Sequence, residues 1–129
     1  MIRKIARKAR IWAEEYARTH RFCRDLGGMC AIASAKLFRL LTDAGYDHVR
    51  IAVNGAHAFV ICDEEIIDVT ATQFGFDKIV ITPLSKVGSS EYFWQAENTF
   101  KSVQAFAKYQ NENDWSEDQI PTYRKLAYK

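Results

Sequence analysis

The sequence lacks any run of about 18 apolar residues, the length a helix needs to cross a membrane. Its first twenty residues, MIRKIARKARIWAEEYARTH, carry charges where a secretory signal peptide has its apolar core. Proline and glycine are scarce, with two and six among 129 residues, and 48% of the residues are hydrophobic, which argues against disorder. We therefore expect a soluble, cytoplasmic protein that forms one domain over residues 1–129.

Cysteine is also sparse. Cys23, Cys30 and Cys62 are odd in number and show no close pairing, so we expect reduced thiols rather than a disulfide framework. His20 with Cys23 and Cys30 offers only part of a zinc site, and no CxxC pair is present. The sequence therefore predicts no metal and no cofactor.

Charge is distributed unevenly along the chain. Up to Arg24 there are eight basic residues against Glu14 and Glu15, whereas the remainder is acidic by four charges. A basic N-terminal helix could contact nucleic acid, an acidic protein or an anionic membrane surface, or it could be a solvated helix face. No aromatic or glycine-rich nucleic-acid module accompanies it, which favours the solvated face.

Helical periodicity dominates both ends of the chain. Residues 2–22 are expected to form an amphipathic helix with its Arg and Lys side chains outward, and residues 30–44 a second helix that Gly45 ends. Gly27 and Gly28 separate these two helices. Residues 92–109 and 116–128 also have a helical pattern, with Ser116 as the N-cap of the last helix.

Between the helices the period changes from 3.6 to two. Residues 49–53 alternate as in a strand with one buried face, and Asn54-Gly55 indicates a turn. Residues 56–62 are apolar on both faces, as in a strand that is covered on both sides. Residues 65–71 and 78–84 predict two more strands, the last ended by Pro83. The predicted class is α+β, with N-terminal helices on a small, mostly antiparallel sheet and helices at the C-terminus.

Cys30 opens its predicted helix in the stretch GGMCAIAS. Unpaired backbone N–H groups and the positive end of the helix dipole favour a thiolate at that position. The preceding glycines let the backbone approach a ligand, and the small residues that follow permit close packing. The simpler alternative is a cysteine that only packs in the core.

A thiolate nucleophile needs a base and a group that orients this base. His57 begins the strand that is apolar on both faces, and Asp68 lies in the next strand, where an unpaired buried carboxylate would be costly. If the turn between these strands contains the two residues Asp63 and Glu64, positions 59 and 68 are opposite and His57 shares their face. An odd loop would place His57 and Asp68 on opposite faces. We predict a catalytic triad of Cys30, His57 and Asp68.

The stretch from Gly28 to Phe74 resembles the core of the transglutaminase-like group of papain-like cysteine enzymes. In that group a cysteine opens a helix, a histidine lies in a context like AHAF, and an aspartate lies in a context like IIDVT. These positions are Cys30, His57 and Asp68 here. Where members often have tryptophan after the cysteine and the histidine, this chain has Ala31 and Phe59.

The resemblance implies a papain-like or transglutaminase-like domain over residues 1–129 and chemistry on an amide of a protein or peptide substrate. Cys30 would attack the carbonyl carbon, His57 would transfer the proton and Asp68 would orient His57. The thioacyl enzyme would react with water, as in a thiol protease or deamidase, or with an amine, as in a transferase. Candidates for the oxyanion hole are the backbone N–H of Cys30 with Gln73, Tyr16 or His20. The alternative function is a non-catalytic module that binds nucleic acid or an acidic protein through the basic helix.

Overall fold

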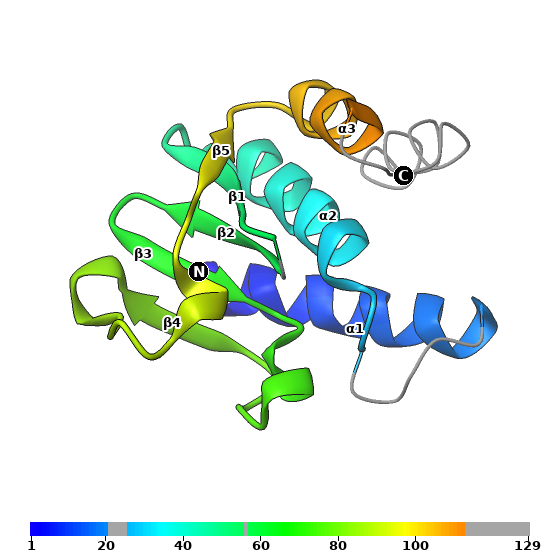
Figure 1. The fold of residues 1–129 in the computed structure, drawn as a ribbon. Coiled ribbons are helices and arrows are strands. Elements are labelled where there is room, and N and C mark those ends of the chain that lie inside the picture. The colour runs from blue at the N-terminus through cyan, green and yellow to red at the C-terminus, as the bar shows by residue number, and fades with distance from the viewer. Residues whose placement is uncertain (21–25, 56, 113–129) are drawn as a thin grey trace.

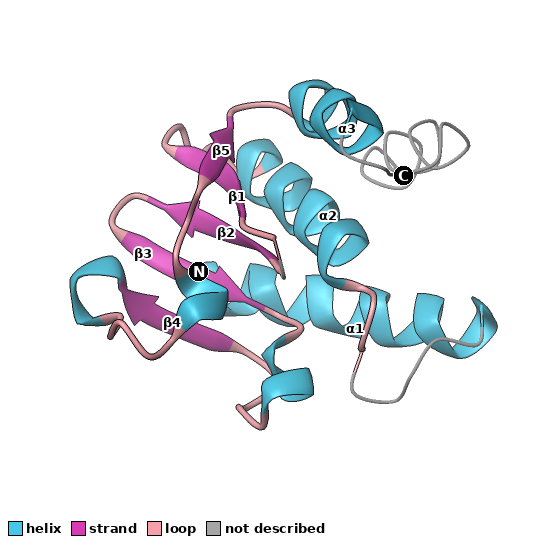
Figure 2. Ribbon diagram, viewed as in Figure 1, coloured by secondary structure: helices cyan, strands magenta, loops and turns pink. Residues whose placement is uncertain are grey.

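The computed structural model describes residues 1–20, 26–55 and 57–112, with side chains described up to residue 110. In this part the chain forms three α-helices and five strands, shown in Figures 1 and 2. The helices are α1 (Ile2–His20), α2 (Cys30–Asp43) and α3 (Val103–Glu112). The strands are β1 (Val49–Val53), β2 (Ala58–Cys62), β3 (Glu65–Asp68), β4 (Val80–Pro83) and β5 (Asn98–Phe100). The predicted α+β class is confirmed.

The five strands form one sheet in the order β4-β3-β2-β1-β5, and every neighbouring pair is antiparallel. The turn between β2 and β3 contains Asp63 and Glu64, because Cys62 pairs with Glu65. Asp63 has a φ of 54°, a left-handed conformation that aspartate tolerates better than most residues. The same register pairs Val60 with Ile67, so Phe59 comes opposite Asp68. This is the register on which the predicted triad depends.

Different elements pack on the two faces of the sheet. Helices α1 and α2 lie on one side in Figure 1, and the segment between β4 and β5 crosses the other side. On the helical side, Val60, Cys62 and Ile67 join the main hydrophobic core. On the other side, Phe59 and Ile61 pack in a second cluster with Phe93 and Trp94. The expectation that the strand carrying Phe59 and Val60 is buried on both faces is confirmed, since all five residues of β2 are buried.

Helix α2 is the central helix. It contacts α1, β1, β2 and α3, and each residue from Ala31 to Phe38 is buried. Its small residues at positions 31, 33, 34 and 35 allow the neighbouring elements to approach closely. The helix ends as the glycine at position 45 predicts: Gly45 has a φ of 96°, and its N–H donates to the carbonyl of Thr42.

The prediction of one helix over residues 92–109 is wrong. Tyr92–Trp94 forms a single 3₁₀ turn, Asn98–Phe100 is strand β5, and α3 begins only at Val103. The side-chain amide of Asn54 donates to the carbonyls of Tyr92, Phe93 and Gln95, so all three carbonyls are bonded to a residue far away in the sequence. The second predicted helix, residues 116–128, lies outside the described residues, as does Ser116.

Helix α1 confirms the amphipathic prediction with one correction. Ile5, Ala9 and Ala13 are buried as the spacing predicts. Arg10 was expected to point outward with the other cations, but its residue is only 4% exposed. Its guanidinium lies beside the segment that follows β3 and donates hydrogen bonds to oxygen atoms of that segment. Among the described helices, none is long and apolar enough to span a membrane.

Candidate active site

The chain enters α2 through two left-handed residues. Leu26 and Gly28 have φ values of 64° and 83°, and the N–H of Met29 donates to the carbonyl of Leu26 at 3.0 Å. Glycine adopts this conformation at low cost, which explains its presence two residues before Cys30. Met29 provides no side-chain cap, so the first N–H groups of α2, beginning with that of Cys30, have no acceptor within the helix. Cys30 is half-buried at this positive helix end.

The turn before β2 holds His57. Asn54 and His57 exchange two hydrogen bonds: the N–H of His57 donates to Asn54 Oδ1 at 2.9 Å, and the N–H of Asn54 donates to the His57 carbonyl at 3.0 Å. The imidazole is packed against the rings of Phe59 and Phe74, with centroids 6.1 Å and 4.9 Å away. The His57 side chain is therefore closed to solvent, with 0% exposure.

Asp68 ends β3 and accepts hydrogen bonds from four donors. His57 Nε2 donates to Oδ2 at 2.6 Å, and Trp94 Nε1 donates to the same oxygen at 2.9 Å. The N–H and the hydroxyl of Thr70 donate to Oδ1 at 2.8 Å and 3.2 Å. The side chain of Asp68 is 1% exposed, and these bonds compensate the desolvation of its carboxylate. The buried carboxylate predicted from the sequence is therefore not left unpaired.

The environment of the pair favours its charged form. Burial by itself lowers the pKa of His57, but the hydrogen bond to Asp68 and interactions with Cys30 outweigh it and raise the pKa to about 9. Burial by itself raises the pKa of Asp68, yet the bonds from His57, Trp94 and Thr70 bring it below the ordinary value. At neutral pH the site therefore contains an imidazolium held by a carboxylate.

Cys30 is the other neighbour of the imidazole. Its interaction raises the pKa of His57, while Nδ1 is buried and makes no hydrogen bond of ordinary geometry with any described residue. Because Nε2 is bound to Asp68, Nδ1 is the nitrogen left for the thiol. In the serine protease triad the carboxylate holds Nδ1 and the nucleophile faces Nε2, so the two nitrogens have exchanged partners here. The three residues predicted as a triad are brought together.

Arg10 supports the segment that carries the carboxylate. Its Nη1 donates to the carbonyl of Val69 at 2.9 Å and to the hydroxyl of Thr72 at 3.0 Å. Val69 follows Asp68 directly, and the guanidinium also interacts electrostatically with that carboxylate. The buried cation thus connects helix α1 to the chain that leaves the triad.

A pocket of about 410 Å³ opens beside the triad. Its lining residues come from the start of α2, the turn between β1 and β2, the 3₁₀ turn after β3 and the end of α3: Gly28, Cys30, Val53, Asn54, Gly55, His57, Ala58, Gln73, Tyr109 and Gln110. Of the three side chains considered for the oxyanion hole, Gln73 is among these residues, and its Nε2 donates to the carbonyl of Thr70 at 3.1 Å. Tyr16 and His20 are instead stacked on each other along α1, with centroids 3.9 Å apart, and do not line the pocket.

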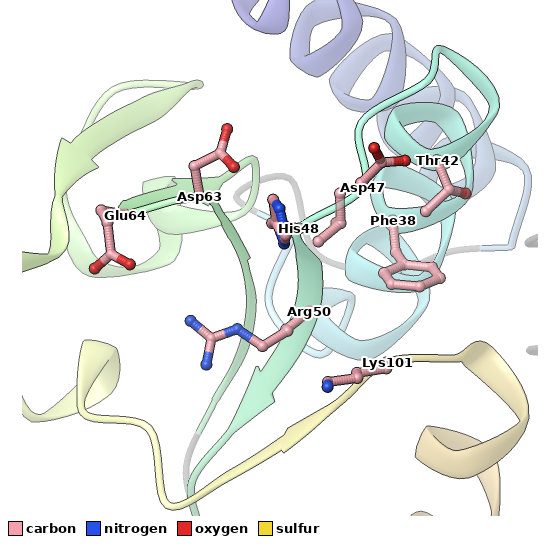
Figure 3. A pocket seen from close by; sticks show the side chains of 9 residues that line it. Phe38, Thr42, Asp47, His48, Arg50, Asp63, Glu64 and Lys101 are labelled. Atoms are coloured by element: carbon pink, nitrogen blue, oxygen red, sulfur yellow. The ribbon is translucent and has the colours of Figure 1, made fainter.

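A larger hollow of about 700 Å³ lies at the opposite end of β1 and β2. Figure 3 shows Arg50 and Lys101 extending into this region, with Asp63, Glu64 and Asp47 at its other side. Its lining includes no cysteine, and the charged side chains of both signs in it come from Asp47, Arg50, Asp63, Glu64 and Lys101. The smaller pocket is therefore the one that has a nucleophile and a base.

The described residues contain no cluster of three or more His, Cys, Asp or Glu side chains that could hold a metal ion. Cys62 is fully buried, and burial together with the charges of Asp63 and Glu65 raises its pKa to about 11. This thiol is a packing residue. Cys23, the third cysteine, lies outside the described residues.

Five residues of the site were not identified from the sequence: Arg10, Asn54 in its role of bonding to His57 and to residues 92–95, Thr70, Trp94 and Gln110. Thr70 had a detectable signal, because an aspartate two residues before a threonine often accepts its backbone N–H in an Asx turn. Trp94 had no such signal, because nothing in the sequence YFW shows that the tryptophan donates to Asp68 rather than only packing in the core.

Comparison with protein-family models, with curated proteins and with solved structures gives no match for this chain.

Proposed function

We propose that this protein is a cysteine-dependent hydrolase or acyl transferase that acts on an amide bond. The observation that carries the proposal is the buried 2.6 Å bond between His57 and Asp68, with Cys30 beside the same imidazole at the start of a helix. A buried histidine that only stabilises the fold would need a hydrogen bond to Asp68 but no cysteine beside the same ring. The resemblance of residues 28–74 to transglutaminase-like and papain-like enzymes is consistent with this reading and extends it to the fold.

The reaction follows from the two charges. Because His57 is already protonated in the pair with Asp68, Cys30 reacts as the thiolate beside it: the sulfur attacks the carbonyl carbon, forming the S–C bond while the carbonyl π electrons move to oxygen. The N–H groups at the start of α2 stabilise that oxyanion. His57 then donates its proton to the amide nitrogen, the C–N bond breaks and the amine leaves. Asp68 stabilises the imidazolium and holds its tautomer throughout.

A thioacyl enzyme remains, and its acceptor decides the class of enzyme. Attack by water with His57 as base restores the thiol and releases a carboxylic acid, as in a thiol protease or a glutamine deamidase. Attack by an amine forms a new amide, as in a transglutaminase. The 410 Å³ pocket can hold a side chain or a short peptide segment, which favours a protein or peptide substrate.

An activated acyl donor tests the first half-reaction without knowledge of the substrate. We expect p-nitrophenyl acetate to give a burst of p-nitrophenol and an acetyl group on Cys30, located by peptide mass spectrometry. Cys62 is the internal control, because its buried thiol has a raised pKa and should not be acetylated. The burst should be lost in Cys30→Ala and strongly reduced in His57→Ala.

Adding an alkylamine in the same assay compares the two acceptors. Faster decay of the acetyl enzyme with formation of the N-alkyl acetamide would assign a transferase, and unchanged decay to acetate would assign a hydrolase. Acetylation of Cys30 that is no faster than that of Cys62 would contradict the proposal.

One observation favours the binding-module alternative as a second candidate. Arg3, Lys4, Arg7 and Lys8 are all exposed on α1 and form no ion pair among the described residues. Ile11, on the same helix, is 59% exposed. Four exposed cations without an ion-pair partner among the described residues attract phosphates.

Fluorescence anisotropy with a labelled DNA duplex tests this candidate. If all four cations bind phosphates, the logarithm of the association constant should fall with the logarithm of salt concentration at a slope of about −3.6. The variant with all four changed to Gln should lose the binding and keep Cys30 acetylation. Absence of binding at low salt would leave the cations as a solvated helix face.

A further inference from the structure

Helix α3 carries one polar residue on its buried face. Val103, Phe106 and Ala107 are each 0% exposed, and Gln110, one helical turn later on that face, is 2% exposed. Packing alone would be served better by leucine or methionine, because a buried carboxamide must be hydrogen-bonded to repay its desolvation. Gln110 is thus a polar exception on an otherwise apolar face.

The carboxamide oxygen of Gln110 is buried and has no hydrogen-bond partner among the residues that the structure describes. The same residue lines the pocket that contains Cys30 and His57. Other polar side chains of this lining are already engaged: Asn54 donates to three carbonyls, and Gln73 donates to Thr70. An acceptor without a donor, closed to bulk solvent and next to a nucleophile, is suited to an N–H group that enters through the pocket.

Resting on the proposed function, we infer that Gln110 is a substrate-binding residue whose Oε1 accepts an N–H from the acyl donor. The inference names a substrate class: acyl groups that carry a carboxamide or a peptide N–H inside the pocket. Esters and fully N-alkylated amides of the same shape leave Oε1 without a partner, so the site discriminates against them. This feature deepens the assignment, since the triad alone does not distinguish an amide substrate from an ester.

Two alkylating reagents that differ only in their N–H groups test the inference. Iodoacetamide has two N–H donors, and N,N-dimethyl-2-iodoacetamide has none. With either reagent the Cys30 thiolate forms an S–C bond and iodide leaves. The rate at Cys30 is measured by peptide mass spectrometry and divided by the rate of the same reagent with glutathione, which removes the difference in intrinsic reactivity.

The wild-type protein should prefer iodoacetamide by about 5-fold after this normalisation, the effect of one hydrogen bond. Gln110→Leu should abolish the preference. Gln110→Glu keeps an acceptor and should retain it, because any effect of the new charge on the thiolate cancels in the ratio. Gln110→Met, whose unbranched side chain is of similar length, replaces the leucine variant if circular dichroism shows that leucine disturbs the fold.

The possible failures are separable. Fast alkylation of Cys30 without a preference in the wild type, or a preference that persists in Gln110→Leu and Gln110→Met because of reagent size, overturns the role of Gln110 alone. A preference lost in Gln110→Glu overturns it as well, since the carboxamide would then act as a donor. Alkylation of Cys30 by both reagents as slow as that of Cys62 overturns the proposed function and this inference together.

Discussion

The protonation state of His57 is the most quantitative consequence of the site. Its pKa of about 9 lies roughly 2.5 units above the ordinary value of 6.5, equivalent to about 3 kcal/mol of preference for the imidazolium. Asp68→Asn removes the hydrogen bond to a carboxylate and the charge that raise this pKa. Burial, which by itself lowers the pKa, is then opposed only by the interactions with Cys30, and we expect His57 to titrate well below about 9 in the variant.

Nuclear magnetic resonance of the imidazole nitrogens measures this directly. In the wild type the His57 signals should remain those of an imidazolium until the pH approaches about 9. In Asp68→Asn the neutral ring should appear at a clearly lower pH than in the wild type. A wild-type His57 that titrates near its ordinary value, or a variant that titrates like the wild type, would refute the electrostatic reasoning.

The same shift makes stability depend on pH. Because the folded pKa of His57 is raised, its contribution is fully present below the unfolded pKa of about 6.5 and is lost as pH rises through about 9. Asp68 acts in the opposite direction: its pKa is lowered, so its contribution is present above the unfolded value and is lost in acid. Urea denaturation in a Cys30→Ser background, which keeps the Asp68 contribution to the His57 shift but removes that of Cys30, should show a loss on the order of 2 kcal/mol across the alkaline interval. The matched control adds His57→Gln and Asp68→Asn and should remove this loss, so an equal loss in the control would contradict the assignment to His57.

Three further changes test individual contacts by urea denaturation. Trp94→Phe removes one donor to the buried Asp68 carboxylate and should lower the free energy of unfolding by about 2 kcal/mol, and no change would show that this bond is not needed. Arg10→Met removes the donor to the carbonyl of Val69 and should lower the free energy of unfolding by about 1 to 3 kcal/mol. Arg7→Met, at an exposed position of the same helix, should change it by less than about 0.5 kcal/mol. Equal effects of the two substitutions would refute the view that Arg10 supports the segment after β3. Gly45→Ala should lower the free energy of unfolding by about 1 kcal/mol, because Gly45 has a φ of 96°. Gly55 has equal space for a Cβ atom but no left-handed φ, so Gly55→Ala should be neutral or slightly stabilising. The reverse order of the two effects would contradict the argument from backbone conformation.

Local patterns predicted much of this fold because each element is decided by its own residues. The helix from Cys30 was recognisable from its period and from the glycine at position 45, and the two-residue turn at Asp63 and Glu64 fixed the register that brings His57 to Asp68. Helix ends, turn residues and alternation are short-range signals, which a sequence displays directly.

The errors came from contacts between distant residues. Arg10 has the same charge as its exposed neighbours, and only the carbonyl of Val69, far along the chain, explains its burial. Residues 98–100 have no strong strand pattern of their own and become a strand because the edge of β1 is available to pair with them. Trp94 and Gln110 likewise acquire their roles from partners in other elements, so periodicity could not distinguish them from core residues.

The central claim is that Cys30 is an activated nucleophile because His57 and Asp68 lie beside it. The most direct measurement is the rate of iodoacetamide alkylation at each cysteine from mildly acidic to alkaline pH, in the native protein and in His57→Ala. The account predicts selective labelling of Cys30 on the acidic side of neutrality, lost in His57→Ala, while buried Cys62 stays unreactive until strongly alkaline pH. Labelling of Cys30 that rises only in alkali and is the same in both proteins would contradict it.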